Sequence, residues 1–149
     1  MTANDSLWAA RAFIYQHFVE TARPPNVEET AAHFQIAADE AAVFYRELDA
    51  RHAIFLDPGT LTIRIANPFS GVPTPFLVHA RGQTYYANCA WDALGIPAAL
   101  HADARIDAEY AEDYAPLNLT VRDGAVTHPG AVAHLLVPFR EWYNDMAYT

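Results

Sequence analysis

The sequence contains no lysine and only one cysteine. Its nine cationic side chains are all arginines, and eighteen acidic residues outnumber them, which gives a formal net charge of −9. Nucleic acids and anionic membranes attract basic surfaces, so we expect neither as a partner. The single cysteine, Cys89, excludes a disulfide within the chain and any metal site built from two of its own thiolates.

Long apolar runs are also missing. No stretch approaches the ~20 apolar residues that a membrane-spanning helix needs. The first residues, Met1-Thr2-Ala3-Asn4-Asp5, lack the basic and apolar regions of a signal peptide. Hydrophobic residues nevertheless make up 52% of the 149 residues, which is enough for a packed core. We therefore expect a soluble, cytoplasmic protein.

Residues 1–66 are predicted to form a winged-helix-like helical module. Apolar residues recur at helical spacing from Asp5 to Thr21, and two prolines then end that helix. Asn26 has the position of an N-cap with Glu29 as its capping-box partner, in front of a short helix to about residue 34. A third helix over about 38–51 and a hairpin over 53–65 complete the pattern. Three helices followed by a hairpin are typical of winged-helix proteins, many of which bind DNA through the third helix.

The predicted third helix is a poor ligand for DNA. Arg46 and Arg51 are outnumbered on it by four acids, Asp39, Glu40, Glu47 and Asp49. Phosphate groups repel such a surface. We therefore interpret the module as a packing or lid unit and keep a DNA-binding regulator as the less favoured alternative.

Residues 67–149 are predicted to form a strand-rich mixed core, which makes the whole chain an α+β protein. The Pro/Gly-rich stretch 67–75 marks the boundary. Strands are expected at 76–79, 84–87, 104–110, 117–121 and 131–137. A short helix over 88–94 lies between the second and third of these strands. Asn88 is its expected N-cap and Gly95 its expected C-cap.

Cys89 and Asp92 are the candidate reactive residues of this short helix. Cys89 is expected in the first turn, where the helix dipole favours the thiolate, the form that attacks electrophiles and binds soft metals. Asp92 follows three residues later and so shares a helix face with Cys89. Tyr85, Tyr86 and Trp91 flank the pair and are the candidate lining of a substrate pocket. Exclusion of water from such a pocket would raise the pKa of Asp92.

Simpler interpretations of these residues stay open. A lone cysteine is often a small buried hydrophobe, and an aspartate in a first turn is often only a partner of the helix dipole. His79 and His101 flank the segment in sequence, and either would activate the thiol if it approached Cys89. Trp142 and Tyr143 are expected to cover the sheet or to close the pocket.

Residues 84–100 read TYYANCAWDALGIPAAL. The Cys-Ala-x-Asp core of this run, followed by Leu and then Pro-Ala, resembles the active-site segment of the alkylmercury lyase (organomercurial lyase) family. The resemblance implies that Cys89 is a catalytic cysteine that binds mercury and that Asp92 is the catalytic aspartate. It also implies protonolysis of a carbon–mercury bond, with a small organomercurial or another soft electrophile as the partner. The family has a helical, winged-helix-like part before its strand-rich core, in the order predicted above.

The sequence departs from the family pattern at one point. Family enzymes complete the ligation of mercury with a second, later cysteine, and this sequence has none. Its residues 140–149 resemble the family segment that lies just upstream of that cysteine. We expect no cofactor. An external thiol or a partner chain is the candidate source of the second sulfur, and we expect turnover to be impaired or altered. The alternatives are a soft-metal or electrophile binding protein without turnover, and a winged-helix regulator that uses Cys89 as a sensor.

Overall fold

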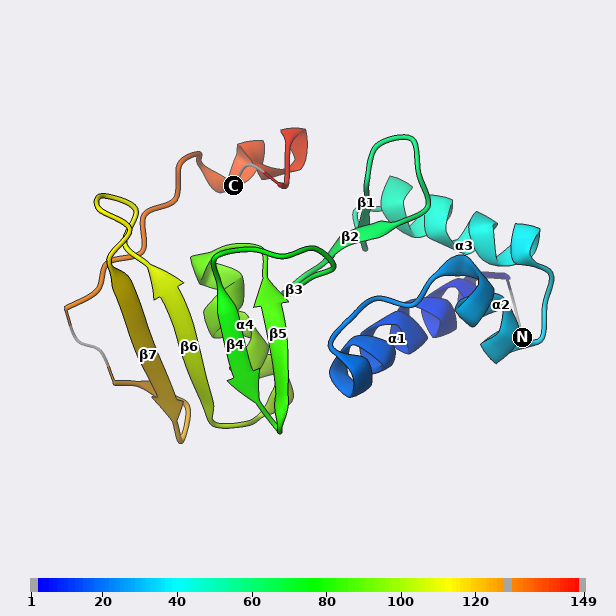
Figure 1. Ribbon diagram of the computed structural model, residues 1–149. Helices are drawn as coiled ribbons and strands as arrows, with labels where there is room; N and C mark the ends of the chain where they lie inside the picture. Colours follow the sequence, from blue (N-terminus) through cyan, green and yellow to red (C-terminus); the bar gives the residue numbers. More distant parts are fainter. Residues whose placement is uncertain (1–2, 128–129, 148–149) are drawn as a thin grey trace. The chain divides into compact units, whose positions relative to one another are not determined.

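The chain forms two compact units, residues 1–66 and 67–149, in a computed structural model that describes residues 3–127 and 130–147. The first unit contains three helices and a hairpin, and the second contains a sheet with a helix on one face (Figure 1). This combination confirms the α+β class predicted from the sequence. None of the helices in the described ranges is long and apolar enough to cross a membrane.

The first unit follows the predicted order of elements. It consists of α1 (Ala3–Thr21), α2 (Val27–Phe34) and α3 (Ala38–Ala50), then of β1 (Phe55–Leu56) and β2 (Ile63–Ala66), which pair as an antiparallel hairpin. The predicted capping box is present. The Asn26 side-chain oxygen accepts the Glu29 N–H at 2.7 Å, and the Glu29 carboxylate accepts the Asn26 N–H at 2.9 Å. The assignment of this unit as a winged helix stays a prediction.

A buried tyrosine links the helices of the first unit. The Tyr45 hydroxyl donates to the Pro25 carbonyl at 3.0 Å and lies 2.8 Å from the Thr30 hydroxyl. Fully buried apolar side chains surround these groups, among them Leu7, Ile14, Phe18, Leu48, Ile54 and Ile63. The acids of α3 lie mostly outside this core, so the helix keeps the acidic surface read from the sequence.

The second unit is an antiparallel sheet in the order β3-β5-β4-β6-β7-β8. Its strands are β3 (Phe69–Ser70), β4 (Leu77–Ala80), β5 (Gln83–Ala87), β6 (Ala104–Glu109), β7 (Pro116–Arg122) and β8 (Ala125–Val126). Two hairpins turn through the pairs Arg81-Gly82 and Asp123-Gly124, where every φ is positive, as tight two-residue hairpins require. Every described pairing in this unit is antiparallel.

Helix α4 (Ala90–Leu100) covers one face of this sheet, behind β4 and β5 in Figure 1. The chain leaves β5, forms α4 and returns as β6 on the other side of β4. Val78 is paired with Tyr85 on one side and with Ile106 on the other, and all three are buried. Side chains alternate along each strand, so these residues face α4 while their neighbours form a more polar opposite face.

Helix α4 is longer than predicted. It begins at Ala90 and runs through Gly95 and Pro97 to Leu100, and His101 is its C-cap with a φ of 47°. Gly95 is therefore not a cap. A side chain there would lie 3.1 Å from Pro68 Cβ, so glycine allows the close approach of this helix to the start of the unit.

The expected strand at 131–137 is also wrong. This stretch is irregular, and a 3₁₀ helix, η1 (Phe139–Asn144), follows it. Apolar alternation predicted a strand, but Val132 and Leu136 are 90% and 61% exposed, and none of the described sheet strands pairs with this stretch. The short strands β3 and β8, of two residues each, were not predicted.

Candidate active site

Cys89 lies where the chain passes from strand β5 into helix α4. Strand β5 ends at Ala87, and Cys89 is the N-cap of α4, with extended backbone angles and its carbonyl accepting the Ala93 N–H at 2.9 Å. We predicted the cap one residue earlier, at Asn88. Asn88 instead lies outside the cap position, and its side-chain amide donates to the Met146 carbonyl at 3.1 Å.

Cys89 and Asp92 form a buried pair. Cys89 is the N-cap and Asp92 the third residue of the helix, so the two side chains lie three positions apart at the same helix start. The Cys89 thiol donates to Asp92 Oδ2, with 3.5 Å between sulfur and oxygen. Only 9% of Cys89 and 8% of Asp92 are exposed. The predicted side-by-side placement of the two groups is present in the structure.

Burial controls the protonation of both groups. It raises the pKa of the Cys89 thiol, and the charge of Asp92 acts in the same direction, while the backbone N–H groups at the helix start oppose them. Burial also raises the pKa of Asp92 to about 6, against the opposing effect of the hydrogen bond from Cys89. The resting pair at neutral pH is therefore a thiol beside a carboxylate.

The expected thiolate is thus wrong for the resting site. The prediction relied on the helix dipole, whose effect on a group at a helix start is modest. Loss of water around a charged sulfur opposes ionisation more strongly at this position. Burial raises the pKa of Asp92, as the sequence predicted for a site that excludes water.

The three aromatic residues proposed to line a pocket do not lie together. Tyr85 is buried on the α4 face of the sheet, where its ring lies 5.3 Å from that of Phe69. Tyr86, the next residue in β5, points to the opposite face. Trp91 belongs to the first turn of α4 and is 65% exposed. Trp91 lines a described pocket near the start of α4, and neither tyrosine is among the lining residues of that pocket.

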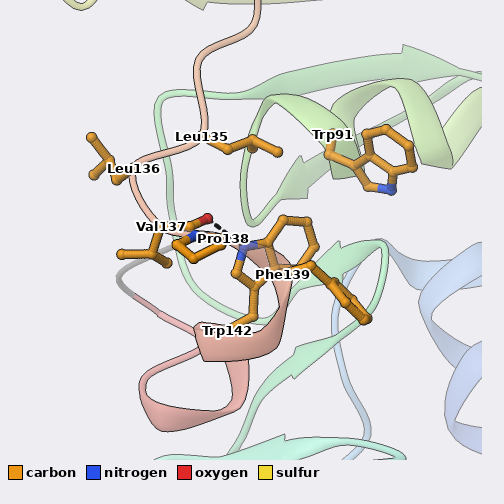
Figure 2. Close-up of a pocket in the computed structure, with 7 residues that line it drawn as sticks. All are labelled: Trp91, Leu135, Leu136, Val137, Pro138, Phe139 and Trp142. Atoms are coloured by element: carbon orange, nitrogen blue, oxygen red, sulfur yellow. Dashed lines mark hydrogen bonds between the residues drawn. The ribbon is translucent and has the colours of Figure 1, made fainter.

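That pocket is apolar and has a volume of about 560 Å³. Figure 2 shows that one side chain comes from α4 and the others from the segment 135–142. We call it the Trp91 pocket; it is lined by Trp91, Leu135, Leu136, Val137, Pro138, Phe139 and Trp142. Cys89 and Asp92 are not among its lining residues, but they flank Trp91 in the chain.

The sequence only partly predicted that the C-terminal segment would line a pocket beside α4. Trp142 was expected to cover the sheet or close a pocket, whereas the bond between Asn88 and Met146 had no signal in the sequence because the two residues are 58 positions apart. These contacts hold residues 135–146 beside the start of α4.

Neither histidine considered as a partner of the thiol adjoins it. His79 lies on the polar face of the sheet, where Nε2 is 2.7 Å from Asp107 and Nδ1 is 2.9 Å from the Thr84 hydroxyl. His101 is the C-cap of α4, and a helix of this length separates its ends by about 17 Å. Asp92 is the hydrogen-bond partner of Cys89.

The described residues contain no group of three or more His, Cys, Asp or Glu side chains arranged to hold a metal ion. Cys89 is the one sulfur nucleophile of the chain. The site therefore offers one soft ligand and one proton-carrying group, which suits the capture of a soft electrophile followed by proton transfer.

Comparisons with known proteins place this segment in a family context. A family model described as alkylmercury lyase matches residues 69–149, more than half of the chain, and this range includes Cys89 and Asp92. A solved structure described as the mercury-bound form of MerB2 is similar, with a TM-score of 0.62 and 22% sequence identity. The match covers 83% of this chain and 63% of that chain, so this chain spans less than two thirds of its length. No curated protein matches.

Proposed function

The chain belongs to the alkylmercury lyase family, and from this premise we propose that it cleaves carbon–mercury bonds by protonolysis. Cys89 captures the mercury and Asp92 delivers the proton. The observation that carries the proposal is the pair itself, a buried thiol that donates to a buried carboxylate 3.5 Å away. Mercury(II) is a soft ion that prefers sulfur, and the proposed partner is accordingly a small organomercurial.

Capture is the first step of the proposed reaction. The Cys89 sulfur bonds to the mercury of R–Hg⁺ while its proton passes to the Asp92 carboxylate. The S–H bond breaks, the S–Hg bond forms, and Asp92 becomes a carboxylic acid. The pKa of about 6 favours this acid form far more than the ordinary value of an aspartate does.

Proton transfer to carbon is the second step. Asp92 gives its proton to the carbon bound to mercury, and that carbon keeps the electron pair of the broken C–Hg bond. The hydrocarbon R–H leaves, and mercury(II) stays on the Cys89 sulfur. An acid with a pKa near the working pH can both receive and return a proton, as this cycle requires.

Release of mercury needs sulfur from outside this chain, because Cys89 is its single cysteine. We propose that a small external thiolate binds the mercury on Cys89, and that a second one displaces it as a bis-thiolate complex. The Cys89 thiolate then regains a proton, and the cycle closes without a resident cofactor.

The direct test is headspace gas analysis of purified protein mixed with phenylmercury or methylmercury and excess small thiol. We expect benzene or methane over many turnovers from wild type, none above the buffer rate from Cys89→Ser, and at most one equivalent from wild type without added thiol. Hydrocarbon release by Cys89→Ser at the wild-type rate would overturn the proposal, as would its absence from wild type.

A binding protein without turnover is the second candidate, and the single thiol favours it. Such a protein would retain one mercury per chain through Cys89 and release no hydrocarbon. Intact-protein mass spectrometry of the same samples separates the two candidates, because it reports whether the retained adduct still carries the organic group.

A further inference from the structure

The Trp91 pocket adjoins the candidate active site through two separate connections. Trp91 lies between Cys89 and Asp92 in the chain and is part of the pocket wall. The opposite wall belongs to the C-terminal segment, which Asn88, the residue before Cys89, holds through the Met146 carbonyl at 3.1 Å. Asn88 and Trp91, which lie on either side of Cys89 in the chain, therefore position this pocket.

We propose that the Trp91 pocket receives the organic group of the substrate and favours an aryl group over methyl, an inference that rests on the proposed function of Cys89 and Asp92. Two-coordinate mercury(II) is linear, so the organic group of a captured substrate points away from the Cys89 sulfur. Among the pockets described here, the Trp91 pocket is the one lined by a residue of the Cys89–Asp92 segment.

The size of the pocket suits a ring. Its volume of about 560 Å³ falls within the roughly 300–1,000 Å³ range of small-molecule sites. A methyl group would leave most of this space to water, whereas a phenyl group would bring far more apolar surface into contact with the walls. Burial of apolar surface is favourable roughly in proportion to its area, so the larger group gains more.

The chemistry of the walls also suits an aromatic group. Trp91, Phe139 and Trp142 supply three rings, and Phe139 and Trp142 already pack edge to face with 5.0 Å between their centroids. Pairs of aromatic rings prefer edge-to-face or offset-stacked arrangements to a direct face-to-face stack. The indole N–H of Trp142 donates to the Val137 carbonyl at 3.0 Å (Figure 2), which leaves the apolar ring surface for the pocket.

The pocket residues are unusually exposed for their type. Trp91 is 65% exposed, Phe139 64% and Leu136 61%. Contiguous exposed apolar side chains of this size commonly mark binding sites. An aryl group seated among them would remove this surface from water.

Two substitutions test the proposal without touching Cys89 or Asp92. Trp91→Ala and Phe139→Ala remove exposed rings, so the fold should persist, and circular dichroism checks this. Trp8→Ala is the matched control, because Trp8 is 44% exposed on α1 in the other unit. For each variant, kcat/KM is measured with phenylmercury and with methylmercury.

A second measurement needs no turnover. Trp91→Ala, Phe139→Ala and Trp8→Ala are each combined with Asp92→Asn, so that a captured organic group stays on the mercury. Limiting protein is offered equal amounts of phenylmercury and methylmercury in the presence of small thiol, and intact-protein mass spectrometry gives the ratio of the two adducts on Cys89. We expect Trp91→Ala and Phe139→Ala each to lower the phenyl-to-methyl ratio about tenfold relative to Trp8→Ala, the usual scale of discrimination by an apolar pocket.

The two measurements separate the two claims. A pocket-dependent adduct ratio, together with no hydrocarbon from protein that keeps Asp92, would support the pocket and defeat the proposed lyase activity. An unchanged phenyl-to-methyl ratio in both pocket variants would overturn the inference, whether or not hydrocarbon is released. Equal losses for both substrates would overturn it as well, because they would show a general defect rather than selection of the organic group.

Discussion

Burial sets the properties of both reactive residues. Asp92 is 8% exposed, and its pKa is raised from 3.8 to about 6. Cys89 is 9% exposed, and its pKa is raised above 9.0. A thiol that resists ionisation is a slow nucleophile by itself, and in the proposed capture step the neighbouring carboxylate receives the proton that mercury displaces. The reactivity of the site therefore depends on the pair.

The raised pKa of Asp92 predicts a pH-dependent gain in stability for Asp92→Asn. A carboxyl whose folded pKa exceeds its unfolded value stabilises the fold most below about pH 4, and that contribution is lost as the pH rises through 6. Above pH 6 the buried charge costs about 3 kcal/mol, from a shift of about two pKa units. An asparagine side chain carries no charge, so the variant should be more stable than wild type by up to about that amount at pH 8 and not at pH 4.

Urea unfolding from pH 4 to pH 8 measures this difference. Asp39→Asn, at an exposed position of α3, is the matched control and should show much less pH dependence. A free energy of unfolding that differs from wild type by the same amount at pH 4 and pH 8 would contradict the assignment of a raised pKa to Asp92.

The raised pKa of Cys89 predicts how the thiol reacts with iodoacetamide. Between pH 7 and 9 the rate should rise about tenfold per pH unit with no plateau, because only the thiolate reacts. Asp92→Asn should react faster at each pH, since the Asp92 charge contributes to the shift. The same cysteine in urea-unfolded protein is the control. A plateau below pH 8 in the folded protein would show a depressed pKa instead.

Helix α4 and the C-terminal segment together form the Trp91 pocket. Helix α4 presents Cys89 and Asp92 at its start and packs its buried side on the sheet. The segment after residue 130 has little regular structure, and the Asn88–Met146 hydrogen bond and the Trp91 pocket hold it beside that start. One wall of the pocket thus belongs to a regular helix, and the other to a segment with little regular secondary structure.

Removal of the Asn88 side chain should loosen this segment. Asn88→Ala deletes the hydrogen bond to the Met146 carbonyl, which is expected to lower the free energy of unfolding by about 1 kcal/mol. Amide hydrogen exchange over 139–147 should become faster, while exchange in β4 and β5 stays unchanged. Asn118→Ala, whose side chain bonds Asp107 at 2.8 Å, is the control and should leave 139–147 unaffected. Unchanged exchange there in Asn88→Ala would contradict the anchoring role.

Local patterns in the sequence predicted local structure well. The Asn26–Glu29 capping box and the Cys89–Asp92 pair both depend on residues three apart on a helix, and both are present. Hairpin strands around Arg81-Gly82 were found for the same reason, since adjacent strands and their turn lie close in sequence. Structural features that depend on a few neighbouring residues can therefore be predicted from the sequence alone.

Features that depend on distant residues were missed. The sequence predicted a helix end at Gly95, but α4 continues through Gly95 to Leu100, with Gly95 close to Pro68. Tertiary contacts often override propensity. The alternation at 131–137 predicted a strand, which needs a partner edge that the sequence cannot supply. The ionisation state of Cys89 was wrong because burial follows from the whole unit, whereas the helix dipole could be read from spacing alone.

The whole molecule carries a strong negative charge, which bears on the remaining alternative of a DNA-binding regulator. The net charge is −9, and α3 exposes Asp39, Glu40 and Glu47 beside Arg46. Duplex DNA binds proteins mainly through phosphate contacts with basic groups. The charge of α3 therefore disfavours it as a recognition helix.

We expect no binding of the full chain to labelled duplex DNA in fluorescence anisotropy at about 50 mM salt, up to protein concentrations of about 100 μM, the upper end of the usual range of non-specific dissociation constants. A repeat with mercury-loaded protein addresses Cys89 as a sensor. Saturable binding that weakens with added salt would contradict this expectation and favour the regulator.

The central claim, that Asp92 supplies the proton which releases the hydrocarbon, is tested most directly by a single-turnover experiment on Asp92→Asn. Wild type and variant are each loaded with one equivalent of methylmercury, and methane and protein-bound mercury are measured from the same vial. We expect both proteins to capture the mercury fully through Cys89. Wild type should release methane, and the variant should release at least a hundredfold less, which is the usual scale for loss of a general acid. Methane from Asp92→Asn at the wild-type rate would contradict it.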